Sequence, residues 1–215
     1  MSADSDKTAD KVQAMFGAIA RRYDLANTAL SFGIHHLWKY CFCRVLPPED
    51  LRVLDLCTGT GDLLPALGTR YGSVVGGDFC APMLEQAQHR FGSRYPLAQL
   101  DALHLGIGAE SFDLVTVSFG VRNFEDLEAG VREIFRILKP GGHLAILEFG
   151  QPAGLFGAIY RWYSKTIMPA IGAFVTGQRS PYEYLPKTAA TFPSGEALMQ
   201  LLEKNGFTRV KLKPL

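Results

Sequence analysis

Apolar residues along most of the chain recur with two alternating spacings, one typical of buried strands and one typical of helices. Short apolar runs predict strands at 53–56, 73–78, 95–100, 113–118, 143–149 and 207–212. Apolar positions at helical spacing predict helices at 63–67, 82–90, 127–138 and 194–205. Strand and helix alternate through five units, so we expect an α/β fold with a doubly wound, mostly parallel sheet covered by helices on both faces.

The first predicted strand and helix are joined by a turn that contains two glycines. Residues 51–62 read Leu-Arg-Val-Leu-Asp-Leu-Cys-Thr-Gly-Thr-Gly-Asp. Gly59 and Gly61 can adopt backbone angles closed to other residues, and without a Cβ they let a ligand lie against the main chain. The free N–H groups that open the following helix favour an anionic or polar group. The stretch therefore predicts the floor of a site for a nucleotide-like cofactor.

The residues around this turn restrict which cofactor fits. No Lys-Ser/Thr pair follows, as a phosphate-binding loop requires, and Leu64 stands where a dinucleotide fingerprint needs a third glycine. Asp55 and Asp62 place carboxylates beside the turn, which suits a cationic ligand better than a pyrophosphate. An ordinary strand, turn and helix of some other α/β protein is the alternative.

Four polar residues fall at the ends of four predicted strands. They are Thr60, Asp78, Asp101 and Ser118. Ligands of parallel sheets bind at the carboxyl edge, so we expect these residues to share one site. Asp78 lies 17 residues after Gly61, where doubly wound folds use an acidic residue to bind ribose hydroxyls. Asp101, with Ala102, would address an adenine amino group or simply occupy a turn.

Two segments fall outside the alternation. Helical spacing of apolar residues from Val12 predicts a helical cap at 10–48, which serves either as a substrate lid or as packed helices with polar caps. The aromatic-rich stretch 151–178 suits an apolar lid, a surface in a membrane interface, or a helical insertion that completes the core. We predict a single domain over 1–215, divided as follows: cap 10–48, cofactor-binding core 49–150, substrate-covering insertion 151–193 (helical near 151–185) and C-terminal helix and strand 194–215.

Composition and charge exclude several function classes. A chain of 215 residues, 47% hydrophobic and 20% charged, suits one globular domain with a substantial core. The net charge of +1 gives no reason to expect nucleic acid as a partner. No apolar run approaches the roughly 20 residues that cross a bilayer, so we expect a cytoplasmic protein. The cysteines lack metal-site spacing and are expected to be buried or half-buried free thiols: Cys41, Cys43, Cys57 and Cys80.

The motifs of the chain resemble those of a known family. The glycine turn resembles the first motif of the class I S-adenosylmethionine-dependent methyltransferases, which are Rossmann-like. Three further segments resemble the signatures of the ubiquinone/menaquinone biosynthesis C-methyltransferases and together cover nearly all of residues 12–213. They are Phe16-x-x-x-Ala20-x-x-Tyr23-Asp24-x-x-Asn27 with Ser31-x-Gly33-x-His35-x-x-Trp38-Lys39; Ser118-Phe119-Gly120-Val121-Arg122-Asn123; and Arg136-x-Leu138-Lys139-Pro140-Gly141-Gly142 with Glu148-Phe149.

This resemblance implies C-methylation of a prenylated quinol, demethylmenaquinol or a related ubiquinol precursor, with S-adenosyl-L-methionine as cofactor. It places the cofactor contacts at Thr60, Asp78, Asp101, Ala102 and Ser118, to which the glycine turn adds Asp55, Gly59 and Gly61. Two departures stand out. Thr58 occupies a place where many members carry glycine, and the family chain continues past this point with another strand, so we expect a truncated C-terminus.

The resemblance also suggests how the reaction proceeds. A phenolic hydroxyl has a pKa of about 10, so its deprotonation near neutral pH needs a base or a stabilising cation. Arg122 stays protonated and is expected to stabilise the phenolate or order a water. Asn123 would hold the quinol oxygen or that water, and Tyr23 would complete the network. His35 would contact the substrate, and its unperturbed pKa is the one that best suits a general base. The alternative is that His35 is a hydrogen-bonded helix-cap histidine.

The sequence is also compatible with other functions. The chain could methylate another small apolar metabolite, or bind the cofactor as a scaffold without turnover, whereas a nicotinamide oxidoreductase is disfavoured by the missing third glycine. Peripheral contact with the inner face of the membrane and a homodimer are both compatible with the sequence.

Overall fold

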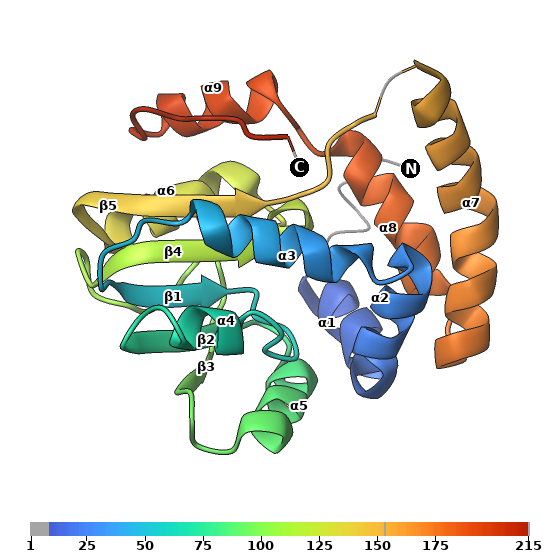
Figure 1. Ribbon diagram of the computed structural model, residues 1–215, viewed down its shortest axis with the longest axis horizontal. Helices are drawn as coiled ribbons and strands as arrows, with labels where there is room; N and C mark the ends of the chain where they lie inside the picture. The colour runs from blue at the N-terminus through green and yellow to red at the C-terminus, as the bar shows by residue number, and fades with distance from the viewer. Residues whose placement is uncertain (1–8, 153, 215) are drawn as a thin grey trace.

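A computed structural model of the protein describes residues 9–152 and 154–214 and contains one five-stranded sheet (Figure 1). The strand order is β3-β2-β1-β4-β5, and every neighbouring pair is parallel. The strands are β1 (Arg52–Leu56), β2 (Ser73–Asp78), β3 (Leu97–Gln99), β4 (Phe112–Ser118) and β5 (Leu138–Leu147). The order reverses direction at β1, which confirms the predicted doubly wound sheet. The ends of the predicted domain, 1–8 and 215, lie outside the described residues.

Eleven helical segments are assigned within the described part of the chain. They are α1 (Ala9–Ile19), η2 (Ala20–Arg22), α2 (Tyr23–Ser31), α3 (Ile34–Val45), α4 (Leu64–Gly68), α5 (Ala81–Phe91), η3 (Val121–Asn123), α6 (Leu127–Ile137), α7 (Gly154–Thr176), α8 (Ser180–Thr191) and α9 (Glu196–Lys204). No helix among residues 9–152 and 154–214 combines the length and the apolar character needed to cross a membrane.

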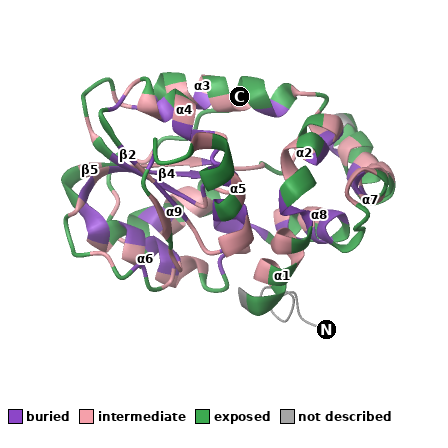
Figure 2. Cartoon of the chain, turned by 90° about the horizontal axis from the view of Figure 1, so that it is seen from below, coloured by how far each residue is buried: buried purple, intermediate pink, exposed green. Residues whose placement is uncertain are grey.

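The apolar run of β1 explains why the sheet is covered on both faces. Successive side chains of a strand point to opposite faces, and Val53 packs in a cluster with Leu64 of α4, whereas Leu54 packs in another with Ile134 of α6. All four side chains are buried almost completely. Seen along the sheet, α3 and α4 lie on one side and α6 and α9 on the other (Figure 2).

The cap and the predicted insertion meet beyond the carboxyl ends of the strands. Helices α1, α2, α7 and α8 gather at that end of the molecule (Figure 1). Ile19, Leu30 and Tyr182 share one buried cluster, and the Tyr163 hydroxyl donates to the Leu30 carbonyl at 2.8 Å. Two segments more than 100 residues apart in the sequence therefore form one helical layer over the carboxyl edge of the sheet.

The predicted sixth strand at 207–212 is wrong. Among the described residues the sheet ends at β5, and the segment after α9 has no strand. Its first apolar residue packs on a helix instead: the Phe207 ring lies 5.1 Å, centre to centre, from Phe135 of α6. An apolar run reports burial but does not specify a hydrogen-bonding neighbour, which explains the error.

Two strand boundaries also differ from the prediction. β3 is shorter than 95–100 because Tyr95 is buried against Phe91 of α5, with ring centres 5.7 Å apart, and does not pair in the sheet. β5 spans Leu138–Leu147 in place of the predicted 143–149, so that it includes Pro140. Its pairing with β4 has a register shift at this point, and an edge strand tolerates a proline that cannot donate.

Candidate functional site

A cavity of about 950 Å³, including its open mouth, lies at the carboxyl ends of β1, β2 and β4. Helix α1 and the start of α2 cover one side of it. The lining brings together seven residues that the sequence had nominated: Tyr23, Gly59, Asp78, Asp101, Ala102, Ser118 and Asn123. Concave, mostly apolar sites with a few polar groups are typical of cofactor and substrate binding.

The cavity floor contains two strained residues. Cys57 and Phe119 directly follow β1 and β4, and their φ angles of 60° and 58° lie in the left-handed region that favours glycine. Gly120 is required beside them, since a Cβ there would lie 2.4 Å from Cys57 Cβ. Such strain costs on the order of 1–3 kcal/mol per residue and concentrates at functional sites.

The two glycines of the turn differ in what they make room for. Both have positive φ angles, 58° at Gly59 and 80° at Gly61. A Cβ on Gly59 would meet nothing within 4 Å, whereas one on Gly61 would lie 2.9 Å from the Phe91 ring. Gly59 therefore leaves the cavity open to a ligand, and Gly61 allows α5 to approach the turn.

Polar groups of the lining suit a polar ligand such as the nucleoside part of S-adenosylmethionine. Asp78 accepts the backbone N–H groups of Gly59 and Cys80, each at 2.8 Å, and each of its oxygens keeps a further lone pair. Burial raises the pKa of Asp78, and those N–H groups partly offset the rise. Within the described residues, Ser118 Oγ and Asn123 Oδ1 are buried without a hydrogen-bond partner. The cavity therefore offers acceptors and donors that a ligand can satisfy.

Asp55, by contrast, does not line the cavity. It is almost fully buried inside the sheet, where it accepts the hydroxyls of Thr58 and Thr116, each at 2.7 Å. Burial raises its pKa to about 6, and the two hydroxyls only partly offset that effect. Thr58, the departure from the family pattern, thus satisfies a buried carboxylate. The structure gives Asp55 a role in holding the turn on β1 and β4.

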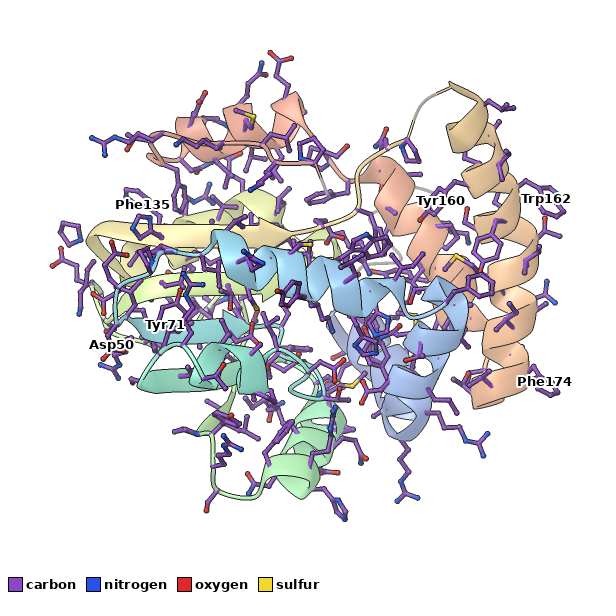
Figure 3. All side chains as sticks on the ribbon, in the orientation of Figure 1. Asp50, Tyr71, Phe135, Tyr160, Trp162 and Phe174 are labelled. Carbon is purple, nitrogen blue, oxygen red and sulfur yellow. The ribbon has the colours of Figure 1, made fainter. Side chains whose placement is uncertain are left out.

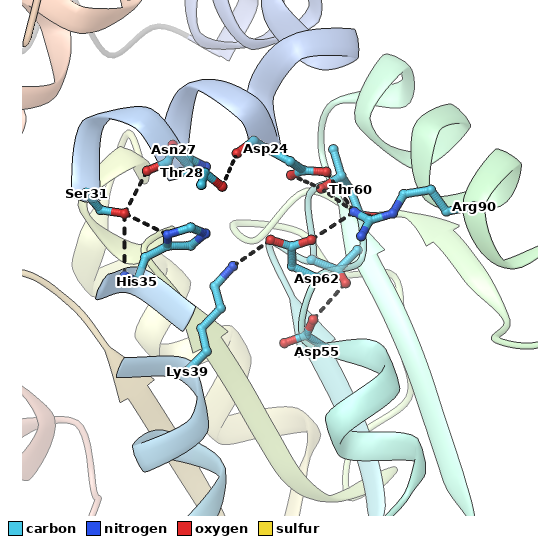
Figure 4. Close-up of polar contacts among 11 residues, drawn as sticks. Asp24, Asn27, Thr28, Ser31, His35, Lys39, Asp55, Thr60, Asp62 and Arg90 are labelled. Carbon is cyan, nitrogen blue, oxygen red and sulfur yellow. Dashed lines mark hydrogen bonds and ion pairs between the residues drawn. The ribbon is translucent and has the colours of Figure 1, made fainter. Parts of the chain in front are cut away.

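Thr60 belongs to a polar cluster on the outer side of the turn (Figure 4). Its hydroxyl donates to Asp24 of α2 at 2.7 Å. Arg90 Nη1 of α5 contacts Asp24 at 2.7 Å, Asp62 at 2.8 Å and the Thr60 carbonyl at 3.2 Å. Lys39 of α3 binds the second oxygen of Asp62 at 3.1 Å. Four separate elements are therefore tied together around the cofactor turn.

Arg122 forms a buried ion pair with Glu148. Arg122 Nη1 donates to Glu148 Oε1, both side chains are almost fully buried, and the guanidinium lies 5.2 Å from the centre of the Phe149 ring. Within the described residues, Arg122 Nε and Glu148 Oε2 have no partner. Arg122 is also one residue from the cavity-lining Asn123. The pair keeps one free donor and one free acceptor.

Tyr23 and His35 occupy different surroundings. Tyr23 lines the cavity, and burial raises its pKa although Asn27, Arg122 and Lys39 act to lower it. His35 is buried outside the cavity lining, and its Nδ1 lies 2.7 Å from Ser31 Oγ. Ser31 already donates its single proton to the Asn27 carbonyl, so His35 Nδ1 must donate and Nε2 is left as a buried acceptor. Burial lowers the pKa of His35 to about 4, with His36 and Lys39 adding to the effect.

Sequence reasoning had not nominated Glu148 or Arg90. Glu148 directly follows β5 at the carboxyl edge of the sheet, so the argument that selected Asp78 and Ser118 would have selected it too. Arg90 lies at the end of a helix far from the turn in sequence, and no local pattern signals its contacts.

Comparison with known proteins identifies the family. The chain matches the model of the ubiE/COQ5 methyltransferase family over residues 4–215. It belongs to this family. It is 42% identical to the demethylmenaquinone methyltransferase of Deinococcus radiodurans, over 95% of this chain and 88% of that protein. It is 41% identical to the ubiquinone/menaquinone biosynthesis C-methyltransferase UbiE of Bdellovibrio bacteriovorus, over 91% of this chain and 86% of that protein.

Solved structures agree with this family in fold. A S-adenosylmethionine-dependent methyltransferase of Thermotoga maritima, described as a possible histamine N-methyltransferase, superposes with a TM-score of 0.68 at 23% identity, covering 92% of this chain and 81% of that chain. The protein is thus an S-adenosylmethionine-dependent methyltransferase of the ubiE/COQ5 family with a Rossmann-like fold.

Proposed function

We propose that this ubiE/COQ5 family member methylates a ring carbon of a prenylated quinol. Demethylmenaquinol is the first candidate and the demethyl precursor of ubiquinol the second. Relatives from Deinococcus radiodurans and Thermus thermophilus, 42% and 41% identical, carry the name demethylmenaquinone methyltransferase. Arg122 and Glu148 do not themselves line the cavity but adjoin its lining at Asn123, and this buried ion pair carries the chemical part of the proposal.

S-adenosylmethionine, when bound, supplies an electrophilic methyl group. The protein must then make the ring carbon nucleophilic, which requires that a quinol hydroxyl lose its proton. Glu148 Oε2 is a buried carboxylate oxygen without a partner among the described residues and serves as the acceptor of that proton. Arg122 Nε, a buried donor of the same ion pair, then binds the phenolate oxygen. As Glu148 is neutralised by the proton, the Arg122 charge becomes free to stabilise the new anion. After the ring carbon has accepted the methyl group, its C–H proton leaves to water, and Glu148 returns its proton to the phenolate oxygen to give the neutral methylated quinol.

Asn123 and Tyr23 are assigned to positioning the substrate. The unpartnered Asn123 Oδ1 accepts from a second hydroxyl or from a water, and Tyr23 lies close enough to Arg122 for its charge to act on the phenol. Asp78, Ser118 and the main chain at Gly59 are assigned to the cofactor. His35, with its lowered pKa, acts as a neutral hydrogen-bond acceptor and not as the base.

A mass-spectrometric methyl-transfer assay tests the proposed function. The protein is incubated with S-adenosylmethionine carrying a trideuterated methyl group and, in separate reactions, with reduced demethylmenaquinone and the reduced ubiquinone precursor. We expect one labelled methyl on a ring carbon, and the relative rates identify the preferred ring. Calorimetry of cofactor binding runs in parallel. Binding without methylation of either quinol would overturn the proposal in favour of a scaffold or another substrate.

We also propose that the protein contacts the inner face of the cytoplasmic membrane peripherally. A prenylated quinol partitions into the bilayer because each buried CH₂ contributes about 0.8 kcal/mol. An enzyme that acts on its ring must therefore work at the bilayer surface.

A further inference from the structure

Helix α7 is apolar on both of its long faces, although one of them points away from the protein. On the inner face, Met168 and Ile171 pack against the buried cluster formed with α2 and α8. The outer face carries large apolar side chains that are mostly exposed: Leu155 79%, Ile159 55%, Trp162 60% and Phe174 90%. Trp162 and Phe174 project outward in Figure 3, whereas Tyr160 points toward the rest of the molecule. A surface helix normally turns a polar face to water.

The charges of α7 have one sign only. From Gly154 to Thr176 the helix contains Arg161 and Lys165 and no acidic residue, and both cations are exposed. A third cation lies at its C-terminal end, where exposed Arg22 donates to the Val175 carbonyl at 3.0 Å. Aromatic and aliphatic residues bordered by cations are typical of helices that lie in the interface of an anionic bilayer.

We propose that α7 is the membrane-docking element and that its outer face (Leu155, Ile159, Trp162 and Phe174) lies on an anionic phospholipid surface. The helix then lies parallel to the membrane, with its inner face still packed on the protein and Arg161 and Lys165 at the level of the headgroups. This inference rests on the proposed function, because a substrate dissolved in lipid gives the docking its purpose.

The same helix connects this surface to the proposed catalytic pair, Arg122 and Glu148. Tyr160 is on the inner side of α7 (Figure 3), and burial raises its pKa, with Arg122 lowering it and Glu148 raising it further. Tyr160 and Trp162 are two residues apart and face opposite ways (Figure 3). One turn of α7 therefore carries both a residue that faces the Arg122–Glu148 pair and a residue of the outer face.

Vesicle sedimentation tests the docking surface. Binding of the full chain is measured to phosphatidylglycerol vesicles and to phosphatidylcholine vesicles, without substrate. We expect preference for the anionic vesicles and at least tenfold weaker binding for the W162Q/F174Q variant, because these side chains lose their burial in lipid. R161Q and K165Q should each weaken binding about fivefold at low salt. The control is V45Q, which replaces a 46% exposed residue at the far end of α3.

Tryptophan fluorescence places the contact on α7 directly. The chain has two tryptophans, and W38F leaves Trp162 as the single probe. Its emission should shift to the blue on anionic vesicles and be quenched by brominated lipids. Unchanged emission, or equal loss of binding by V45Q and W162Q/F174Q, would overturn the proposal. So would a dimer in sedimentation velocity that W162Q/F174Q converts to monomer, since the face would then be a protein interface.

Activity separates this inference from the proposed function. On a water-soluble quinol with a short side chain, W162Q/F174Q should keep the parent turnover, and it should lose at least tenfold on long-chain quinol embedded in anionic vesicles. Equal loss on both substrates would contradict docking. Vesicle binding by a protein that methylates neither quinol would leave α7 as a docking element and reject the quinol substrate.

Discussion

Asp55 and Asp78 are buried carboxylates on neighbouring strands, and their partners give them different parts in the site. Asp78 accepts backbone N–H groups and lines the cavity, whereas both oxygens of Asp55 are occupied by threonine hydroxyls inside the sheet. Residue type and position along a strand led us to expect both at the cofactor. Only their hydrogen-bond partners distinguish them.

Replacing Asp55 with Asn is expected to change how stability depends on pH. Burial raises the pKa of Asp55 from 3.8 to about 6, so the folded state holds this proton more tightly than the unfolded state. The resulting stability is fully present below pH 4 and is lost as the pH rises through 6, a difference of about 2–3 kcal/mol. Urea unfolding from pH 4 to pH 8 measures it. D55N should lack this component, and parallel pH profiles for D55N and the parent would contradict the assignment.

Substituting the two glycines of the turn one at a time should separate an effect on ligand binding from an effect on folding stability. G59A places a methyl group in the open cavity at a positive φ, so we expect about 1 kcal/mol lower stability and roughly tenfold weaker S-adenosylmethionine binding. In G61A the added methyl group lies too close to the Phe91 ring, so the free energy of unfolding should fall by about 2–3 kcal/mol. Denaturant unfolding and calorimetry measure the two effects. A larger loss of stability in G59A than in G61A would reverse the roles.

The proton acceptor role of Glu148 is tested by E148Q. The amide keeps the shape but cannot take a proton, so kcat should fall about 100-fold or more while S-adenosylmethionine affinity changes less than threefold. Because Arg122 loses its buried partner, unfolding should also become easier by about 3 kcal/mol. E148D, which can still accept a proton, should recover part of kcat. Equal kcat in E148Q and the parent would rule out the role.

Among the elements, the link between the cap and the cofactor turn is polar and partly exposed. Asp24 and Arg90 are each more than one third exposed, whereas Asp62 is largely buried between Arg90 and Lys39. Burial opposes ionisation of Asp62, but the two cations outweigh it and lower its pKa. Since Asp24 directly follows Tyr23, this cluster sets how the cap presents Tyr23 to the cavity.

A double-mutant cycle on Asp24 and Arg90 tests that link. Exposed ion pairs contribute little to stability, so we expect a coupling energy of about 0.5–1 kcal/mol from D24N, R90A and the double variant. The larger effect should be on function: R90A is expected to weaken S-adenosylmethionine binding about fivefold, and added salt should reduce the difference. R132A removes an exposed arginine of a helical ion pair on α6 and serves as control. Equal cofactor binding by R90A and R132A would rule the link out.

The boundaries of a strand were predicted well where the strand is buried on both faces of the sheet. The apolar runs of β1 and β4 indicated their positions because their residues contact helices above and below. The edges of the sheet were harder to predict. β3 is limited to three paired residues, β5 incorporates a proline, and the segment at 207–212 packs on α6 without pairing. A strand with only three paired residues, or one that contains a proline and a register shift, is too short or too irregular to show a strand pattern distinct from that of a packed loop.

At the scale of the whole molecule, the cavity is closed by two distant parts of the chain. Its floor belongs to the turns after the strands, and one wall belongs to α1, through Val12 and Phe16. With the cofactor in the proposed site, contacts to both parts would join α1 to the sheet and stabilise the folded state by mass action.

Hydrogen exchange should report this closure. We expect amides of α1 to exchange at least fivefold more slowly with saturating S-adenosylmethionine, whereas amides of α9, which lies beyond the β5 edge of the sheet and away from α1 (Figure 1), should be unchanged. Mass spectrometry of peptides from the two helices provides the comparison. A uniform slowing across both helices would indicate global stabilisation only, and no change in α1 would place the cofactor elsewhere.

The sequence by itself determined the parallel sheet, the glycine turn and the edge at which Asp78, Asp101 and Ser118 meet, whereas Thr60, expected with them, does not line the cavity. These follow from local rules, because burial periodicity and turn chemistry act over a few residues. Tertiary structure alone decided that Asp55 is internal, that Arg122 is paired with Glu148 and that α7 turns an apolar face outward. Each of these depends on which distant segment lies opposite a side chain, and no local pattern carries that information.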